Sequence, residues 1–424
     1  MSFPAVIALI AGLTFLYRVY NHRPTSTPKV FPSRETDPDA AAVSKESNYP
    51  EGYLTSPILF SLEHRAIFSK TWMALTHKSH LPTAGSYTTL PHPTAPLLLI
   101  KGKDNQIRAF HNVCRHRAYP VTRRESGKST VLSCRYHGWS YNTRGELIKA
   151  PQFDGVVGFE RSKNGLFGVG VDVDENGIVW VNLGVKGEGE GEESRILETG
   201  DIGNRAGSGK ESVRVGGGVV DGGFNWKLAL RKSYLVNALA LESQREELPS
   251  PLRSILHYFQ RKPESTHLFP CAFVFTIPSS NSWLLLNFLP SSETATSVRY
   301  ELYSQDIKKS EELKPLLTDL ETKVKAIVSN LEAEYKSSIK ASGDPTSIFS
   351  CFDQTSLETQ TQILSLLKAH TKLEKSHGGE IYPARREPRM NTKYEQAEQR
   401  ACLIYLSPLP GHPIRGCLFR GTLL

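Results

Sequence analysis

The sequence predicts an α+β protein, in which a small all-β domain is followed by a second domain that combines an antiparallel sheet with long helices. Short apolar runs separated by turn residues fill residues 51–185, and further β-rich runs occupy residues 271–303. Apolar residues then recur at helical spacing from Leu316 to Tyr335. A chain of 424 residues is long enough to give each of two domains its own core.

Composition divides the chain into segments. They are a membrane anchor (1–20), a Pro- and Ser-rich tether (21–50), the all-β domain (51–185), a Gly-rich linker or loop (186–223) and the second domain (224–424).

The anchor is predicted from an uncharged apolar run between Phe3 and Tyr17, slightly short of the ~20 residues that span a bilayer. A signal peptide is the competing interpretation, but no Lys or Arg precedes the run. Arg18 and Arg23 follow it, which by the positive-inside rule places the rest of the chain in the cytosol. We therefore expect a membrane protein with a single N-terminal pass and a cytosolic main body; a buried or interfacial helix is the alternative.

The all-β domain is expected to open with a helical stretch around residues 63–68 that ends at Trp72. Residues 96–100 and 107–110 are typical of two short strands separated by a turn at 102–105. Residues 177–183 have the pattern of a closing strand.

Two short clusters in this domain have metal-ligand spacing: Cys114-Arg115-His116 and, further on, Cys134-Arg135-Tyr136-His137. Two thiolates and two neutral imidazoles are the ligand set of a [2Fe–2S] centre of the Rieske kind, in which the cysteines hold one iron and the histidines the other. We expect Cys114 and Cys134 to hold the inner iron, and His116 and His137 the outer one. Zinc is the alternative, although zinc fingers usually pair Cys with Cys and His with His.

In the second domain, residues 271–278, 283–289 and 296–303 are β-rich runs that predict an antiparallel meander. A long amphipathic helix should pack on that sheet. Another helix is expected from an N-cap near Ser356 to a stop at Gly378.

Composition excludes some functions. The formal charge of +8 is moderate and no basic stripe is interleaved with aromatics, so nucleic-acid binding is not expected. A solvated surface, or docking to an acidic electron donor, is favoured instead. Beyond the two ligand cysteines, Cys271, Cys351, Cys402 and Cys417 are scattered without a disulfide framework. That distribution suits a reducing compartment.

The chain resembles the large (alpha) subunit of Rieske non-haem iron oxygenases, the ring-hydroxylating dioxygenase and choline monooxygenase-like group. The resemblance rests on Ile67–Trp72, Arg108–Arg117, Cys134–Tyr141, Pro151 and Phe224-Asn225-Trp226-Lys227-Leu228. It implies a helix-grip-like second domain, a homo- or hetero-trimer, a reductase or ferredoxin as electron donor, and a mononuclear Fe(II) that activates O₂. Where respiratory-type Rieske proteins have two further cysteines, this chain has Tyr119 and Tyr136, which resembles the lower-potential branch; Ala118 stands where the family usually has Gly.

The resemblance ends at residues 229–242, where the family supplies two histidines for the mononuclear iron and an acidic residue that bridges the two metal centres. Arg231 and Lys232 fall near the acidic position. His257 and His267 are the histidines nearby, and each is more often a core or surface residue than a ligand. For the carboxylate, the long helix offers Glu332 and Glu334; a solvated glutamate is the alternative role for each.

Two functions are therefore open. The first is an oxidoreductase of the Rieske oxygenase type that hydroxylates, demethylates or desaturates a lipophilic small molecule with O₂. The second is a non-catalytic electron-transfer protein or partner subunit that has lost the mononuclear iron site. The catalytic residues of the first function are unknown from sequence.

Overall fold

The computed structural model describes residues 49–153, 155–184, 212–239, 265–277, 280–306, 312–342, 348–349 and 352–382. Contacts divide the chain into two units, Met1–Asn48 and Tyr49–Leu424, and every described residue belongs to the second.

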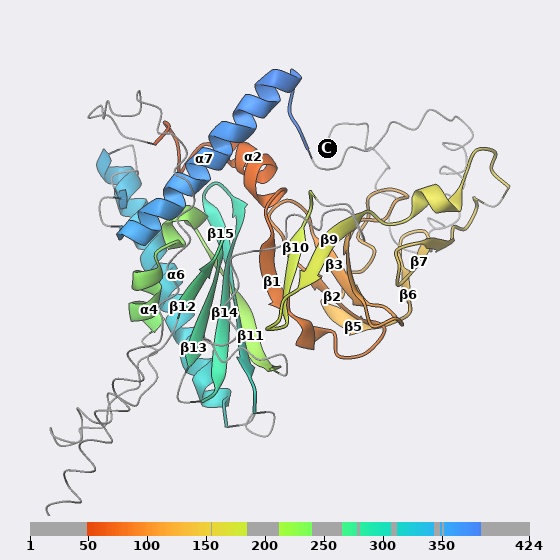
Figure 1. Cartoon of the computed structure of the whole chain (residues 1–424), viewed down its shortest axis with the longest axis horizontal. Helices are drawn as coiled ribbons and strands as arrows, with labels where there is room; N and C mark the ends of the chain where they lie inside the picture. Colours follow the sequence, from red (N-terminus) through yellow and green to blue (C-terminus); the bar gives the residue numbers. More distant parts are fainter. Residues whose placement is uncertain are drawn as a thin grey trace, which may run out of the picture. The chain divides into compact units, whose positions relative to one another are not determined.

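The first domain begins with helix α2 and is otherwise built from strands (Figure 1). Ser56 caps α2 (Pro57–Glu63) through its side chain, which accepts from the Leu59 N–H, and the helix continues into a π-helical turn, η2 (His64–Phe68). A seven-stranded sheet has the order β1-β10-β9-β4-β3-β2-β5, and a three-stranded sheet has the order β6-β7-β8. The strands are β1 (Met73–His77), β2 (Ser86–Leu90), β3 (Leu97–Lys101), β4 (Ile107–His111), β5 (Ser126–Lys128), β6 (Val131–Ser133), β7 (Ser140–Asn142), β8 (Leu147–Lys149), β9 (Gly168–Val173) and β10 (Ile178–Asn182), with short helical turns η3 (Lys78–His80) and η4 (Arg161–Asn164).

The second domain is a five-stranded antiparallel sheet of order β11-β15-β14-β13-β12. Its strands are β11 (Val213–Gly222), β12 (Ser265–Leu268), β13 (Ala272–Ile277), β14 (Ser282–Ser292) and β15 (Ala295–Ser304). The predicted meander is therefore present. β11, however, lies inside the segment predicted as a linker or loop. That prediction is wrong for residues 213–222, which form a strand.

The glycines of β11 have a packing reason. A Cβ added at Gly216 would collide with Leu317 of the long helix, and one added at Gly217 would collide with the Tyr300 carbonyl of β15. Close approach of a helix and a neighbouring strand thus requires small residues here, which makes a strand look like a flexible linker in the sequence.

Helices complete the second domain: the turn η6 (Trp226–Ala229), α4 (Lys232–Leu239), α6 (Lys314–Ser342) and α7 (Gln354–His377). The apolar stripe of α6, including Leu320, Val324 and Leu331, is buried. α7 begins at Asp353, whose side chain accepts from the Ser356 N–H, and it ends at Gly378 with a left-handed φ of 75°. Both predicted helices are present, with ends close to those expected.

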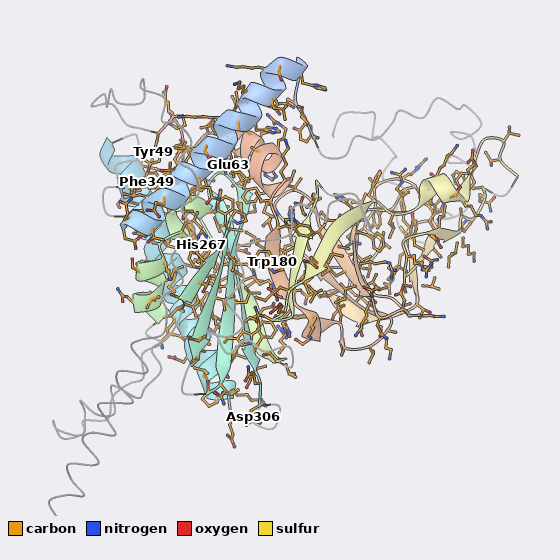
Figure 2. The ribbon with its side chains drawn as sticks, in the orientation of Figure 1. Tyr49, Glu63, Trp180, His267, Asp306 and Phe349 are labelled. Carbon is orange, nitrogen blue, oxygen red and sulfur yellow. The ribbon has the colours of Figure 1, made fainter. Side chains whose placement is uncertain are left out.

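The two domains share packed contacts. The rings of Tyr49 and Phe349 lie 4.5 Å apart between centroids (Figure 2), and Tyr335 of α6 donates a 2.9 Å hydrogen bond to the Leu54 carbonyl. One hydrophobic core includes residues from both domains.

The Asn225-Trp226-Lys227 segment forms a buried polar junction between the domains. Lys227 is fully buried; its Nζ pairs with the Glu63 carboxylate of α2 and donates to the Tyr53 carbonyl at 2.5 Å. Trp226 Nε1 donates to the other Glu63 oxygen at 2.8 Å. Asn225 Nδ2 donates to carbonyls in both domains, one of them that of Leu54 at 3.1 Å. The motif that supports the family resemblance therefore holds α2 against the second domain.

The membrane prediction requires correction. Within the described part of the chain, no helix is long and apolar enough to cross a bilayer. The predicted anchor, residues 1–20, and nearly all of the tether, residues 21–50, lie outside the described residues. The physical weakness of the prediction is length, because the uncharged run from Phe3 to Tyr17 is shorter than the ~20 residues that a bilayer needs.

Candidate [2Fe–2S] site

Two loops with the same backbone turn present the candidate ligands. The first follows β4 and the second joins β6 to β7. In each loop the cysteine carbonyl accepts a 3.0 Å hydrogen bond from the N–H four residues later: Ala118 to Cys114, and Gly138 to Cys134. Those fourth residues both have left-handed φ angles, 55° for Ala118 and 70° for Gly138. Glycine adopts this conformation at no steric cost, whereas Ala118 adopts it with strain.

The loops bring all four candidate ligands together in the interior. Cys114, His116, Cys134 and His137 are each 1–2 % exposed. The His116 and His137 rings lie 4.6 Å apart between centroids, at an interplanar angle of 75°. The two thiols hydrogen-bond to each other, which raises the pKa of Cys114 and lowers that of Cys134 to about 6. This arrangement gives a sulfur pair and an imidazole pair.

The electrostatics of the pocket favour the ligand form of His137. Burial, helped by the charge of Arg117, lowers the pKa of His137 to about 4, so its imidazole is neutral at pH 7. A neutral imidazole is the form that binds iron.

Aromatic side chains enclose the ligands. Trp139 stacks on His116 with centroids 5.0 Å apart, and Phe153 meets the same ring edge-on at 5.4 Å. Tyr141 places its hydroxyl 3.2 Å from the Cys114 sulfur and accepts from the Arg115 N–H at 3.1 Å. Once Cys114 is a thiolate, the Tyr141 hydroxyl is its hydrogen-bond donor.

The four residues fit a binuclear cluster. Each iron of a Rieske centre takes two protein ligands, either two cysteines or two histidines. A single-ion site would need at least three, and no group of three His, Cys, Asp or Glu side chains able to hold one ion is present among the described residues. The donor set therefore suits [2Fe–2S] better than zinc.

A ring contact joins the two loops where a disulfide does so in the respiratory branch. The Tyr119 and Tyr136 rings lie 4.9 Å apart between centroids, and Tyr136 also contacts the His137 ring at 3.9 Å. Both loop cysteines, Cys114 and Cys134, are free.

Comparison with known proteins decides the nature of the first domain. A family model described as "Rieske [2Fe-2S] domain" matches residues 71–160. The chain contains a Rieske domain. The match covers both ligand loops, and it supports the [2Fe–2S] interpretation over zinc.

Relatives with curated descriptions resemble the chain over the same region. The alpha subunit of 2-aminobenzenesulfonate 2,3-dioxygenase from Alcaligenes sp is 37 % identical over 128 residues, 30 % of this chain and 32 % of the relative. The carnitine monooxygenase oxygenase subunit of Acinetobacter pittii is 31 % identical over 135 residues, 32 % of this chain and 36 % of the relative. The chain thus matches only about a third of the length of these relatives.

Solved structures extend the likeness beyond the Rieske domain. A quaternary ammonium Rieske monooxygenase bound to gamma-butyrobetaine aligns over 70 % of this chain and 86 % of its own, with a TM-score of 0.56 and 21 % identity. A naphthalene 1,2-dioxygenase bound to phenanthrene aligns over 69 % and 81 %, with a TM-score of 0.55 and 20 % identity. The second domain therefore has the fold of Rieske oxygenases.

The described residues do not fit a mononuclear iron site in the second domain. Glu334 of α6 is held by Arg231, whose guanidinium donates to both carboxylate oxygens at 2.9 and 2.5 Å. Glu332 accepts a 2.6 Å hydrogen bond from the Gly223 N–H. His267 stacks on Phe273 with centroids 4.5 Å apart, and burial lowers its pKa to about 4. Both candidate carboxylates are thus engaged.

The remaining candidates are placed as follows. Lys232 begins α4 and is half-buried, whereas His257 lies outside the described residues. Arg231 is further held by the Leu228 carbonyl at 3.1 Å and by the Tyr234 ring, 4.5 Å from its guanidinium carbon. A cation so fixed beside Glu334 opposes an iron(II) ion there.

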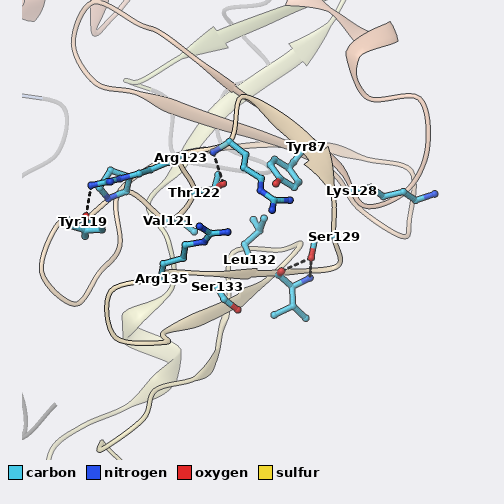
Figure 3. Close-up of a pocket in the computed structure, with 13 residues that line it drawn as sticks. Tyr87, Tyr119, Val121, Thr122, Arg123, Lys128, Ser129, Leu132, Ser133 and Arg135 are labelled. Atoms are coloured by element: carbon cyan, nitrogen blue, oxygen red, sulfur yellow. Dashed lines mark hydrogen bonds between the residues drawn. The ribbon is translucent and has the colours of Figure 1, made fainter. Parts of the chain in front are cut away.

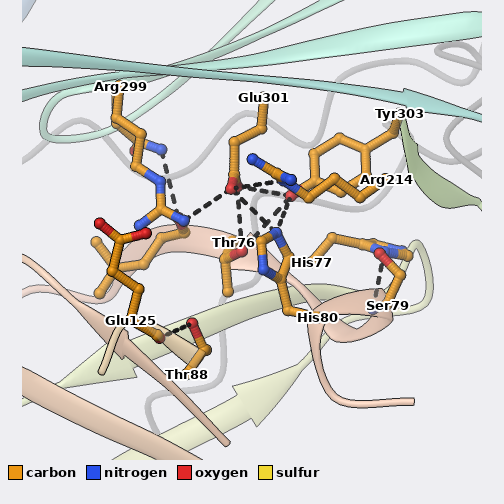
Figure 4. Close-up of polar contacts among 12 residues, drawn as sticks. Thr76, His77, Ser79, His80, Thr88, Glu125, Arg214, Arg299, Glu301 and Tyr303 are labelled. Carbon is orange, nitrogen blue, oxygen red and sulfur yellow. Dashed lines mark hydrogen bonds and ion pairs between the residues drawn. The ribbon is translucent and has the colours of Figure 1, made fainter. Parts of the chain in front are cut away.

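A second polar cluster, which the sequence did not indicate, links the Rieske domain to β15 (Figure 4). The Glu301 carboxylate, 1 % exposed, lies 3.0 Å from His80 Nε2, 2.7 Å from Arg299 and 3.5 Å from Arg214. Its other oxygen accepts from Tyr303 at 2.6 Å and from Thr76 at 3.1 Å. Burial alone would raise the pKa of Glu301, but the His80 hydrogen bond and the Arg299 charge hold it well below its usual range. The cluster joins three segments that are distant in sequence, around Thr76–His80, Arg214 and Arg299–Tyr303, so only the fold reveals it.

Proposed function

We propose that this chain is an oxidoreductase of the Rieske oxygenase type, which passes single electrons through a [2Fe–2S] cluster for the O₂-dependent hydroxylation, demethylation or desaturation of a lipophilic small molecule. The observation on which this depends most is the convergence of Cys114, His116, Cys134 and His137 from two matching loops of a Rieske domain. The oxygenase fold of the second domain and the names of the relatives support the choice of reaction class.

The residues have separate tasks in this proposal. Cys114 and Cys134 would hold the inner iron, and His116 and His137 the outer one. A cluster so held supplies reversible one-electron reduction. Tyr141 directs its hydroxyl at the Cys114 sulfur, and the stacked Trp139 keeps water away from His116.

The partners follow from the same proposal. A reductase or ferredoxin would supply the electrons, a small molecule would be the substrate, and a homo- or hetero-trimer would be the assembly. A related quaternary ammonium Rieske monooxygenase is described in terms of inter-subunit electron transfer, and its fold resembles this one with a TM-score of 0.54.

The ion pair between Arg231 and Glu334 favours a second candidate function: a Rieske electron carrier, or a partner subunit without its own mononuclear iron. In that case the electron leaves the cluster for another protein. The second domain would serve as a packing and assembly module.

Metal and sulfide analysis of the full-length protein, purified without oxygen, separates the two. The oxygenase predicts about three irons and two acid-labile sulfides per chain, with a high-spin iron–nitrosyl EPR signal after NO is added. The electron carrier predicts two irons, two sulfides and no such signal. A Cys134→Ser variant is the control for the cluster, because it should lose the sulfides and the Rieske EPR signal. A protein with one zinc and no sulfide would refute both.

A further inference from the structure

A hollow of about 520 Å³ lies on the Rieske domain, with its lining residues drawn from residues 87–135 (Figure 3). Ser133 and Arg135, which flank the candidate ligand Cys134, line it, and so does Tyr119 of the other loop. The hollow is thus lined by residues of both ligand loops.

The charged side chains that line this hollow are all positive. Its lining includes the exposed side chains of Arg123, Arg124, Lys128 and Arg135, and no acidic side chain. Among the described residues, no ion pair is formed by Arg124, Lys128 or Arg135. Four like charges around a concave surface focus the field and attract an anionic surface.

An aromatic contact leads from the hollow to the cluster ligands. Tyr119, in the lining, lies under the Arg123 guanidinium, whose carbon is 4.8 Å from its ring centroid. The Tyr119 ring also contacts that of Tyr136, with centroids 4.9 Å apart. Tyr136 in turn contacts His137 at 3.9 Å. A donor seated here is therefore separated from the proposed outer-iron ligand by two rings in van der Waals contact.

We propose that this basic hollow is the docking site of an acidic electron-donor protein with a one-electron centre. One electron leaves the reduced donor and reduces the cluster by one electron, with no bond made or broken. Val131, 41 % exposed at the same surface, adds an apolar contact inside the basic rim, an arrangement common at transient interfaces. The proposal depends on the proposed cluster, and holds for either candidate function.

The test measures binding and electron transfer with an acidic plant-type [2Fe–2S] ferredoxin, whose potential lies below that of Rieske centres. The variant is Arg124→Glu/Lys128→Glu, which reverses two charges of the hollow without touching a residue next to a ligand. Lys103→Glu is the matched control, because Lys103 is exposed in the same domain and outside the hollow. Unchanged cluster absorption and EPR signals show that the variants are intact.

We expect the double variant to bind oxidised ferredoxin at least ten-fold more slowly at low salt than the wild type does, and Lys103→Glu to bind within two-fold of it. The difference should vanish at 0.5 M salt, where charges are screened. Reduction by the methyl viologen radical cation should change in the opposite direction and become faster in the double variant. This reversed sign separates docking from damage to the cluster.

Equal ferredoxin association for wild type and double variant at low salt, or no association with the wild type, overturns the proposal. So does slower reduction of the double variant by both reductants. If the protein has no cluster, the proposed function fails instead, and the absorption and EPR spectra show this before any binding is measured.

Discussion

The buried pair of Lys227 and Glu63 gives the sharpest prediction for stability. The side chains are 0 % and 1 % exposed, so neither charge has access to water. Replacing Lys227 with Met keeps the volume but leaves the Glu63 carboxylate without its cation. Breaking a buried ion pair from one side costs about 3–5 kcal/mol. The remaining hydrogen bond from Trp226 Nε1 compensates only in part.

Replacing Glu63 instead of Lys227 should cost less free energy of unfolding. Burial lowers the pKa of Lys227, so in Glu63→Gln the lysine can release its proton instead of remaining as an unpaired charge. For Glu63→Gln we expect a loss of about 2 kcal/mol in the free energy of unfolding. The double variant Lys227→Met/Glu63→Gln should lose roughly 2–3 kcal/mol less than the sum of the two single losses, because it has no unpaired charge.

Chemical denaturation followed by tryptophan fluorescence, with the midpoints of all variants compared under one condition, measures these differences. The exposed pair Lys325–Glu321 on α6 is the control, and Lys325→Met should leave the midpoint unchanged. Additive losses in the double variant, or a Lys227→Met midpoint equal to that of the wild type, would refute the reasoning.

Three further predictions concern the ligand loops and the acid stability. Ala118→Gly should raise the free energy of unfolding by up to about 1 kcal/mol in denaturation, because Ala118 has a left-handed φ of 55°; a less stable variant would contradict this. Tyr141→Phe should lower the reduction potential of the cluster, because the Cys114 sulfur loses a hydrogen-bond donor. A hydrogen bond of about 1 kcal/mol corresponds to roughly 40 mV for one electron, which a redox titration followed by EPR would measure. An unchanged potential would show that the hydroxyl does not reach the thiolate. The hydrogen bond from Arg65 lowers the pKa of Glu374 from 4.5 to about 2. The stability that this carboxylate contributes is therefore complete above pH 4.5 and is lost as the pH falls toward 2. In denaturation at a series of pH values, Glu374→Gln should flatten the dependence of unfolding free energy on pH in that window, and an identical slope would refute the assignment.

Local patterns were sufficient for much of the fold. Alternation and turn residues located β3, β4 and β10, and helical spacing with a terminal Gly378 located α6 and α7. β11 was missed because strand prediction depends on side chains with β propensity, whereas this strand needs glycines to admit Leu317 and the Tyr300 carbonyl. Propensity describes the preference of a residue by itself. It holds no information on a packing neighbour that is about a hundred residues away in the sequence.

The candidate site likewise has a part that the sequence predicts and a part that only the structure shows. The ligand spacing within each loop is local, so the four ligands could be named from the sequence. The hydroxyl of Tyr141 beside Cys114, and Glu301 surrounded by cations, depend on contacts across 27 and more than 200 residues. No sequence window contains both partners of such contacts, and no turn or periodicity marks them.

The Asn225-Trp226-Lys227 segment shows how a family motif can be kept for a reason other than the metal that follows it. Its three side chains contact Leu54, Glu63 and Tyr53, and they hold α2 against the second domain. The resemblance in this segment is therefore evidence for the fold and carries no weight for a mononuclear iron. What bears on the iron is Arg231, four residues after Lys227 and directly before α4, because it pairs with Glu334 of α6. This ion pair occupies the Glu334 carboxylate, one of the two that the long helix offers for a metal. The protein can thus keep the oxygenase fold and an electron-accepting cluster whether or not it binds a third iron, and the iron count per chain is the measurement that separates its two candidate functions.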